Sequence, residues 1–289
     1  MIPRFELHRP ATIHDASGLL NEFPGEAVPY AGGTELLQVM KLGLASFRHL
    51  VDVKGIPALR GIDVMPDGWL RIGATSTHRE IERSTLVASH VPALASLERQ
   101  IANVRVRNTG TLGGNLCFAE PHSDPAAFLL AADGRVRLSS ADAERELSID
   151  DFVAGPLLTG RDQGELLVEV RVPPRVANRG HGFAKLAFFE RPAASVACRI
   201  DLQGGRIAAV RVAVGSACEA PTLLGSIGPV LVGVRLQELE EALATARDAA
   251  RDEVLTYDDI NGSADYKRHL VGLLLGQAVK AAHREATRG

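Results

Sequence analysis

Cysteine is scarce in this chain of 289 residues, and its spacing excludes several kinds of metal centre. The residues Cys117, Cys198 and Cys218 are far apart, and no two of them form a C-x-x-C pair. An ordinary iron–sulfur cluster takes more thiolates than these can supply. No two histidines stand at H-x-x-x-H spacing, although a zinc site built from histidines stays open. We therefore interpret the cysteines as buried, reduced thiols and expect no metal redox centre on this chain.

Several other features are missing, and each absence removes a class of function. The formal net charge is −3 and no basic stripe is interleaved with aromatic residues, which argues against a nucleic-acid-binding protein. The apolar run over residues 270–275 is too short to span a bilayer, which takes about 20 apolar residues. Residues 1–10 lack the apolar core of a secretory signal, so we expect a cytoplasmic protein without a transmembrane segment.

The common signatures of nucleotide and hydrolase sites are also missing. No G-x-G-x-x-G follows an expected strand and no G-K-[ST] closes a glycine loop, which excludes the Rossmann and P-loop patterns. G-x-S-x-G is absent, as is the H-x-E with P-C-x-x-C pattern of zinc deaminases. Any ligand-binding loop in this chain therefore has to be recognised by its own chemistry.

Two glycine-paired stretches are the most informative feature that is present. The first is Ala31-Gly32-Gly33-Thr34-Glu35-Leu36, and the second is Thr109-Gly110-Thr111-Leu112-Gly113-Gly114-Asn115. Each places glycine N–H groups beside hydroxyl side chains, and successive exposed amides form a concavity that binds anions. A single Gly-Gly-Thr turn is usually only a turn. Two such loops in one chain are able to hold both phosphates of a dinucleotide from opposite sides.

The length is typical of about two domains, and the apolar spacing predicts helices mixed with strands. Before residue 173 the pattern predicts helices over 12–23, 34–44, 92–101 and 123–134, and strands over 27–31, 49–53, 69–74, 136–139 and 166–172. The segment from Pro173 to Gly182 holds little that is apolar, and we interpret it as the domain boundary. Beyond it we expect strands over 182–189, 195–202 and 207–214, a hairpin turn at Gly204-Gly205, and helices over 236–254 and 264–283.

Three local signals predict where helices begin. Thr34 and Ser123 stand where an N-cap side chain is expected, the second just before Pro125 at the start of its helix. Thr77 and Glu80 have the spacing of a capping box.

These motifs resemble those of the flavoprotein subunits of the molybdenum hydroxylases. That family includes the medium subunit of aerobic carbon monoxide dehydrogenase and the FAD domain of xanthine dehydrogenase. The two glycine stretches are similar to the family's loops for the FAD pyrophosphate, and they stand in the family's order. Three further segments match, namely Ile72 to Ile81, Val104 to Asn108, and Asp265 to Leu270. The resemblance covers nearly the whole chain.

The resemblance implies an α+β fold in two parts. Residues 1–174 would form an FAD-binding domain of the vanillyl-alcohol-oxidase or PCMH-like type, with lobes over about 1–55 and 56–174. Residues 175–289 would form a C-terminal domain of the carbon monoxide dehydrogenase flavoprotein type, with a three-stranded antiparallel sheet and helices.

The resemblance also implies which residues contact FAD. They are Ala31, Gly32, Gly33, Thr34, Glu35, Leu36, Ile101, Thr109, Thr111, Leu112, Gly113, Gly114, Asn115, Asp124, Leu167 and Lys185. Asp124 matches the family's acidic contact, but capping its own helix explains it equally well. If the alignment with the family shifts by one residue, Leu166 takes the place of Leu167 as the FAD contact. Either leucine is also explained as an ordinary core residue. Family members often carry an aromatic side chain facing the flavin where this chain has Ser195. The resemblance therefore does not indicate which oxidant reaches the flavin.

The implied function is that of an FAD-bearing electron-transfer subunit in an oxidoreductase complex. FAD would bind noncovalently, a large subunit would hold molybdopterin and the substrate pocket, and a small subunit would hold [2Fe-2S] clusters. A dimer of such heterotrimers is expected, and no catalytic acid or base is expected on this chain, where His78 and His122 are interpreted as structural. Two alternatives remain, a self-contained FAD-dependent oxidase or reductase with its own organic substrate, and a non-catalytic interaction or sensor module.

Overall fold

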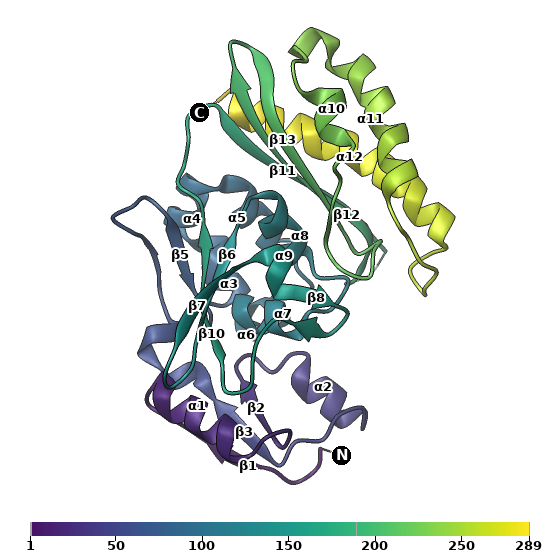
Figure 1. Ribbon diagram of the computed structural model, residues 1–289. Helices are drawn as coiled ribbons and strands as arrows, with labels where there is room; N and C mark the ends of the chain where they lie inside the picture. Colours follow the sequence, from purple (N-terminus) through teal and green to yellow (C-terminus); the bar gives the residue numbers. More distant parts are fainter. Residues whose placement is uncertain (1, 189, 289) are drawn as a thin grey trace.

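Three sheets divide the chain, and each is built from a different stretch of the sequence. The computed structural model describes residues 2–188 and 190–288. Figure 1 shows an N-terminal sheet at the bottom of the view, a larger sheet in the middle and a C-terminal sheet at the top.

The N-terminal sheet is parallel, with strand order β1-β3-β2. Its part of the chain comprises β1 (Glu6–His8), α1 (Ile13–Glu22), β2 (Ala27–Tyr30), α2 (Leu36–Lys41), β3 (His49–Asp52) and the short 3-10 helices Val53–Gly55 and Pro57–Leu59. Thr12 caps α1, because its hydroxyl oxygen accepts a hydrogen bond from the N–H of Asp15 at 3.1 Å. Ala16 and Leu20 of α1 are buried with Val51 of β3, so α1 covers one face of this sheet.

The middle sheet is antiparallel, with strand order β4-β5-β10-β6-β7. The strands are β4 (Ile62–Val64), β5 (Leu70–Gly73), β6 (Arg135–Ser139), β7 (Glu144–Ser148) and β10 (Leu166–Val172), and a separate two-stranded ribbon is formed by β8 (Val153–Gly155) and β9 (Leu158–Thr159). The helices of this part are α3 (His78–Arg83), α4 (Thr85–His90), α5 (Pro92–Glu98), α6 (Val104–Thr109), α7 (Leu112–Phe118), α8 (Asp124–Ala131) and α9 (Ile149–Phe152). Central β10 is buried at all but one residue, which explains its nearly continuous apolar sequence.

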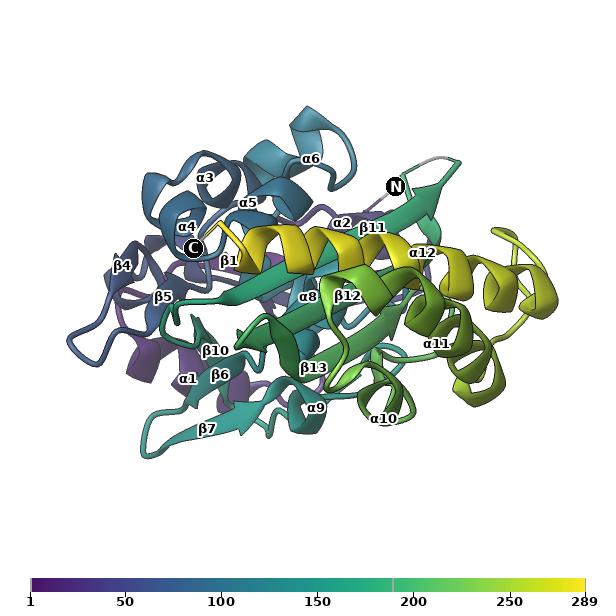
Figure 2. The ribbon, with the colours of Figure 1, turned by 90° about the horizontal axis from the view of Figure 1, so that it is seen from above.

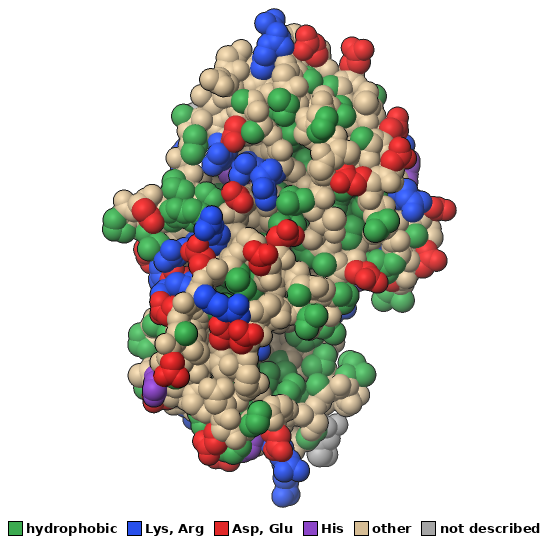
Figure 3. Space-filling model, in the orientation of Figure 1, with side chains coloured by type: hydrophobic (Ala, Val, Ile, Leu, Met, Phe, Trp, Pro, Cys, Tyr) green, Lys and Arg blue, Asp and Glu red, His purple; other side chains and the backbone are tan. Residues whose placement is uncertain are grey.

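One charged residue interrupts the apolar centre of β10. Glu169 is buried, and its carboxylate pairs with Arg71 at 2.6 Å, Arg171 at 2.6 Å and Arg137 at 3.1 Å. Burial alone would raise the pKa of Glu169, but the three guanidinium groups outweigh it and lower that pKa. Figure 3 shows Lys or Arg side chains interleaved with Asp or Glu side chains over the region of β7 and β10.

The three predicted helix-start signals have different outcomes. The capping box is confirmed, since the Glu80 carboxylate accepts from the Thr77 N–H at 2.7 Å and the Thr77 hydroxyl accepts from the Glu80 N–H at 3.1 Å. The prediction for Thr34 was wrong, whereas Ser123 does stand at the N-cap position of α8 but without the expected side-chain bond. Glu35 precedes α2 instead, and Ser123 makes no cap bond because its hydroxyl donates to Asn115 Oδ1 at 2.6 Å.

The C-terminal sheet contains the three expected strands and the expected hairpin turn, and it adds a fourth strand. It is antiparallel, in the order β11-β12-β13-β14, so the three predicted strands are joined by a fourth of two residues. Its elements are β11 (Arg179–Ala187), β12 (Pro192–Gln203), β13 (Arg206–Gly215), β14 (Thr222–Leu223), α10 (Ile227–Leu231), the 3-10 helix Leu236–Glu238, α11 (Leu239–Glu253) and α12 (Ala264–Ala286). Gly204 and Gly205 have φ of +57° and +74°, as the predicted hairpin turn requires. The last residue of the predicted strand over 182–189 lies outside the described residues.

Helices cover both faces of the C-terminal sheet. Helix α12 runs along β11 and β12, and Figure 2 shows it lying across them from above. Gly182 makes this approach possible, because a Cβ there would collide with the backbone of Ala278 and Ala282 in α12. On the other face, Phe183, Ala197 and α8 join the core of the middle sheet. The C-terminal sheet therefore packs against α8, the helix that begins at Asp124.

Candidate functional site

A cleft of about 340 Å³ lies where the N-terminal sheet meets the helices of the middle part. Both glycine stretches line it, together with the start of α8 and the first residues of β10. Figure 3 shows the molecule hollowed at this place, between α2 and α7 of Figure 1. A second hollow of about 600 Å³ adjoins it and shares Ala31, Gly32, Thr75 and Thr111 as lining residues.

The first glycine stretch offers the cleft a row of free backbone donors. Among the described residues, the N–H groups of residues 32–36 donate to no other group of the protein, whereas the N–H of Leu37 donates to the Gly33 carbonyl at 3.1 Å. Gly33 has φ of +70°, which favours glycine and turns the chain sharply after β2. Successive amides of this kind form a concave site for an anion.

The second glycine stretch uses its backbone N–H groups differently. The N–H groups of Leu112 and Gly113 donate to the carbonyls of Ser76 at 3.0 Å and Ala74 at 2.9 Å, and that of Gly114 donates to the Thr111 hydroxyl at 3.1 Å. These amides therefore hold α7 against the end of β5 and cap it. They are not available to a phosphate in this conformation.

The adjacent glycines Gly113 and Gly114 have different surroundings. A Cβ on Gly113 would lie 2.6 Å from the Ala74 Cβ, so this glycine is required for close packing. A Cβ on Gly114 would meet only the Thr111 hydroxyl at 2.8 Å and the Ala31 Cβ at 4.0 Å. Gly114 thus borders the open gap between the loops.

The loops also touch each other directly. A Cβ on Gly32 would lie 2.7 Å from the Gly110 Cα and would collide with the carbonyl of Thr109. This contact fixes the first loop against the second and sets the width of the cleft.

A buried ion pair closes the side of the cleft that faces the C-terminal sheet. Lys185 Nζ donates to Asp124 Oδ2 at 2.6 Å and to the Gln100 carbonyl at 2.8 Å, and the Asp124 and Lys185 side chains are 5% and 9% exposed. The other oxygen, Asp124 Oδ1, is buried without a hydrogen-bond partner among the described residues. Burial raises the pKa of Asp124, and Lys185 offsets only part of the effect. Asp124 lines the cleft, and leaving a buried acceptor without a partner costs about 1–3 kcal/mol.

Charged side chains line the mouth of the cleft. Arg191 pairs with Glu120 at 3.2 Å and with Glu35 at 3.4 Å. It thereby connects the start of β12 to the first glycine stretch and to the segment that follows α7. Burial raises the pKa of Glu35, and the charge of Arg191 offsets only part of this rise. Burial would also raise the pKa of Glu120, but its bond to His122 outweighs that effect and lowers the pKa.

His122 connects the cleft to the last helix. Its Nδ1 lies 2.8 Å from Glu120 Oε1, and its Nε2 lies 2.9 Å from Asp259 Oδ2. Burial alone would lower the pKa of His122, but Glu120 and Asp259 outweigh it and raise that pKa. Asp259 in turn pairs at 2.7 Å with Lys267, a fully buried residue of α12, and its pKa is lowered to about 2 in spite of burial. The chain of pairs fixes the loop that carries Glu120.

Most of the predicted contacts meet in this one cleft. Those that line it are Ala31, Gly32, Gly33, Thr34, Glu35, Leu36, Ile101, Thr111, Gly113, Gly114, Asn115, Asp124 and Leu167. Thr109 lines the adjoining hollow, Leu112 is fully buried beneath the second loop, and Lys185 reaches the cleft through Asp124. Leu166 lines the cleft as well, so the lining does not decide between Leu166 and Leu167.

Sequence reasoning missed several lining residues. They are Val28, Pro29, Gln38, Arg161 and Arg191, which carry no recognisable motif. The structural interpretation of His78 fits its surroundings, because its Nδ1 lies 2.6 Å from the buried carboxylate of Glu98. Among the cysteines, Cys198 and Cys218 are buried, whereas Cys117 is half-buried at the cleft, and all are free thiols.

Comparison with known proteins identifies the family. The sequence model described as "FAD binding domain in molybdopterin dehydrogenase" matches residues 3–175. The chain belongs to this family. A second model, described as "CO dehydrogenase flavoprotein C-terminal domain", matches residues 190–282. The predicted family, the α+β fold class and FAD as the cofactor are thereby confirmed.

Individual relatives extend over the whole chain. The carbon monoxide dehydrogenase medium chain of Hydrogenophaga pseudoflava is 32% identical, with 97% of each chain covered. The nicotine 6-hydroxylase medium subunit of Paenarthrobacter nicotinovorans is 33% identical, with 97% of this chain and 98% of the relative covered. A solved structure of carbon monoxide dehydrogenase from Hydrogenophaga pseudoflava superposes with a TM-score of 0.94 at 31% identity and covers 99% of each chain. These matches make the chain a subunit of the oxidoreductase type that the sequence predicted.

The residues of the cleft fit FAD. Free amides, an open gap at Gly114 and the unpaired Asp124 Oδ1 supply what a pyrophosphate and a polar ring system need. No helix in the described part of the chain is both long and apolar enough to cross a membrane.

Proposed function

We propose that this chain is the FAD-bearing electron-transfer subunit of a molybdenum hydroxylase complex and holds one FAD noncovalently in the cleft. The observation that carries the proposal is the row of free backbone N–H groups over residues 32–36, which faces the gap at Gly114. Bound there, FAD would take electrons singly from an iron–sulfur partner and release them in pairs to an external acceptor.

The roles of the lining residues follow from their contacts. The first loop donates its backbone hydrogen bonds to the pyrophosphate, and Thr34 adds a hydroxyl. The second loop supplies shape, with Gly114 leaving room and Asn115 held by Ser123 at 2.6 Å. Asp124 accepts a hydrogen bond through Oδ1 while Lys185 holds it in place. Ile101 and Leu167 provide apolar walls.

The proposed partners are a large subunit with molybdopterin and a small subunit with [2Fe-2S] clusters, assembled in the cytoplasm as a dimer of heterotrimers. Support comes from apolar side chains next to the cleft. Leu42 and Leu44, which follow α2, are 66% and 74% exposed. Permanent interfaces are rich in such side chains, so we assign this edge of the cleft to the iron–sulfur subunit.

The test follows flavin reduction under anaerobic conditions. The chain is expressed alone and together with its large and small subunits, and candidate substrates of the complex are added to each. Reduction is expected only in the complex. Rapid reduction of the isolated chain by a small organic substrate would contradict the proposal and favour the self-contained oxidoreductase.

A matched pair of variants tests the proposed interface. Leu44→Glu should lower the yield of the complex while FAD content per chain stays unchanged. Leu273→Glu, at an exposed position on distant α12, serves as the control and should assemble normally. Normal assembly of Leu44→Glu would place the partner elsewhere.

A further inference from the structure

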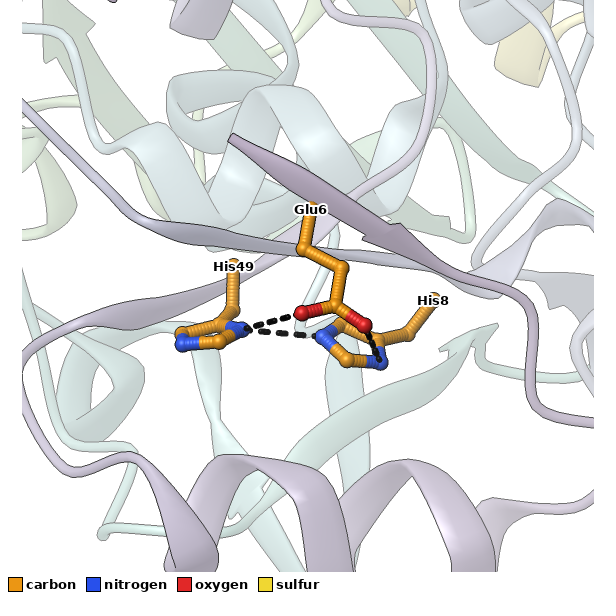
Figure 4. A group of neighbouring side chains, drawn as sticks. All are labelled: Glu6, His8 and His49. Atoms are coloured by element: carbon orange, nitrogen blue, oxygen red, sulfur yellow. Dashed lines mark hydrogen bonds and ion pairs between the residues drawn. The ribbon is translucent and has the colours of Figure 1, made fainter. Parts of the chain in front are cut away.

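Two histidines and a glutamate meet at the edge of the N-terminal sheet, away from the cleft. Glu6 and His8 lie on the same face of β1 because they are two residues apart, and His49 of β3 is paired in parallel register with Glu6. All three side chains therefore project from one face, as Figure 4 shows. Strand β2, which lines the cleft, lies on the other side of β3.

The ligand atoms are close enough to share one metal ion. His8 Nε2 lies 3.0 Å from His49 Nδ1, and Glu6 Oε2 lies 3.8 Å from His49 Nδ1. One oxygen or nitrogen atom of each residue lies within 4.8 Å of the others. Two ligands at about 2.1 Å from a tetrahedral zinc ion are about 3.4 Å apart, so the observed spacings bracket this value.

The two imidazole rings are held in place by their surroundings. Their side chains are 16% and 15% exposed, and the ring of Phe23 stacks on His49 with centroids 3.8 Å apart and an angle of 12°. Glu6 is 68% exposed, so its carboxylate is able to swing onto an ion at small cost. An open hollow beside His8 gives solvent access and leaves space for a water as fourth ligand.

We propose that His8, His49 and Glu6 bind one divalent transition-metal ion of the zinc class, which ties the short strand β1 to β3. Binding would replace the hydrogen bond between the two histidines by bonds to the ion and would add a link across an edge that otherwise rests on three paired residues. The site is independent of FAD, since it lies on the far edge of the sheet from the cleft.

The test uses the full chain loaded with FAD and treated with EDTA. Zinc chloride or cobalt chloride is added, excess metal is removed by gel filtration, and bound metal per chain is measured. About one ion per chain is expected, together with a visible cobalt spectrum and slower hydrogen exchange over residues 5–9. Removal of a ligand should weaken binding by more than the about 10–100-fold typical of an outer-shell partner.

Two variants and a control make the result specific. Glu6→Gln changes an exposed side chain, so it should fold normally and lose metal affinity, and His8→Asn should behave likewise. His269→Asn, at an exposed histidine of α12, should bind metal like the unmodified chain. Binding that is absent in the unmodified chain, or equal in Glu6→Gln, His8→Asn and the control, would overturn the proposal and leave a hydrogen-bonded histidine pair.

Discussion

Gly114→Ala should separate FAD binding from folding more cleanly than any other change in the loops. Gly114 is the third residue of α7, and it borders the gap that faces Ala31. Gly33, by contrast, has φ of +70°, so a substitution there strains the fold whether or not FAD is present. The comparison therefore centres on Gly114, with Gly113→Ala as the variant that should do the opposite.

The magnitudes follow from the contacts of each added methyl group. In the protein without FAD, alanine in a helix gains up to about 1 kcal/mol over glycine. Displacing the Thr111 hydroxyl, 2.8 Å from the new Cβ at Gly114, costs about 1 kcal/mol of capping. The net change in stability is close to zero. With FAD, the methyl group would push the phosphate away from the free amides of residues 32–36, and losing one such hydrogen bond to a charged group costs about 1.5–3 kcal/mol. The dissociation constant should therefore rise about 10- to 150-fold.

Gly113→Ala has the reverse expectation. Its methyl group would lie 2.6 Å from the Ala74 Cβ, and overpacking of this kind costs about 1–3 kcal/mol. The melting temperature should fall by about 2–4 °C for each kcal/mol.

The assay measures melting of the proteins without FAD and FAD titrations of the folded proteins. Gly228→Ala, in α10 with open space around the added Cβ, is the control and should change neither quantity markedly. Normal FAD affinity of Gly114→Ala, or losses of stability as large as its losses of affinity, would refute the reasoning.

Four further substitutions test the electrostatic part of the account. Lys185→Met leaves the buried Asp124 carboxylate without its cation and should cost about 3 kcal/mol of stability. Asp124→Asn should weaken FAD binding about tenfold with a smaller loss of stability. For Asp124→Asn, a loss of stability in thermal melts as large as the loss of affinity in FAD titrations would contradict this. Glu169→Gln should cost about 2 kcal/mol in urea unfolding at pH 7. Folding lowers the pKa of Glu169. The difference in free energy of unfolding between the two proteins should therefore be present above the unfolded-state pKa of about 4.3 and fade as the pH falls below that value. An undiminished difference at pH 3 would be inconsistent with the ion pairs. Folding raises the pKa of His122, so the stabilisation from its contacts with Glu120 and Asp259 is full below about pH 6.5 and is lost as the pH rises through the folded-state pKa. The difference in melting temperature between His122→Gln and the unmodified protein should therefore shrink between pH 6 and 9. A constant difference would count against these ion pairs.

Local signals in the sequence predicted local structure well. The Thr77–Glu80 capping box and the Gly204-Gly205 turn depend only on neighbouring residues, and both are confirmed. Ser123 stands at the predicted N-cap position but makes no side-chain cap bond, because its hydroxyl bonds to Asn115, eight residues away in another helix. The two-residue strand β14 was missed because only its pairing with β13 defines it.

The candidate site shows the same division. The motifs named residues that do line one cleft, since glycine and hydroxyl residues are recognisable in sequence. The sequence did not reveal which loop has free amides, because that depends on bonds from Leu112 and Gly113 to Ser76 and Ala74. It also gave no sign that His122 pairs with Asp259, which lies 137 residues further along the chain.

The most direct test of the account is the stoichiometry and attachment of FAD in the isolated chain. The purified protein is titrated with FAD, its visible spectrum is recorded, and the complex is then precipitated with acid. We expect one FAD per chain, released into the supernatant. A protein that takes up no FAD, or a pellet that stays yellow, would contradict a noncovalent site between the two glycine loops.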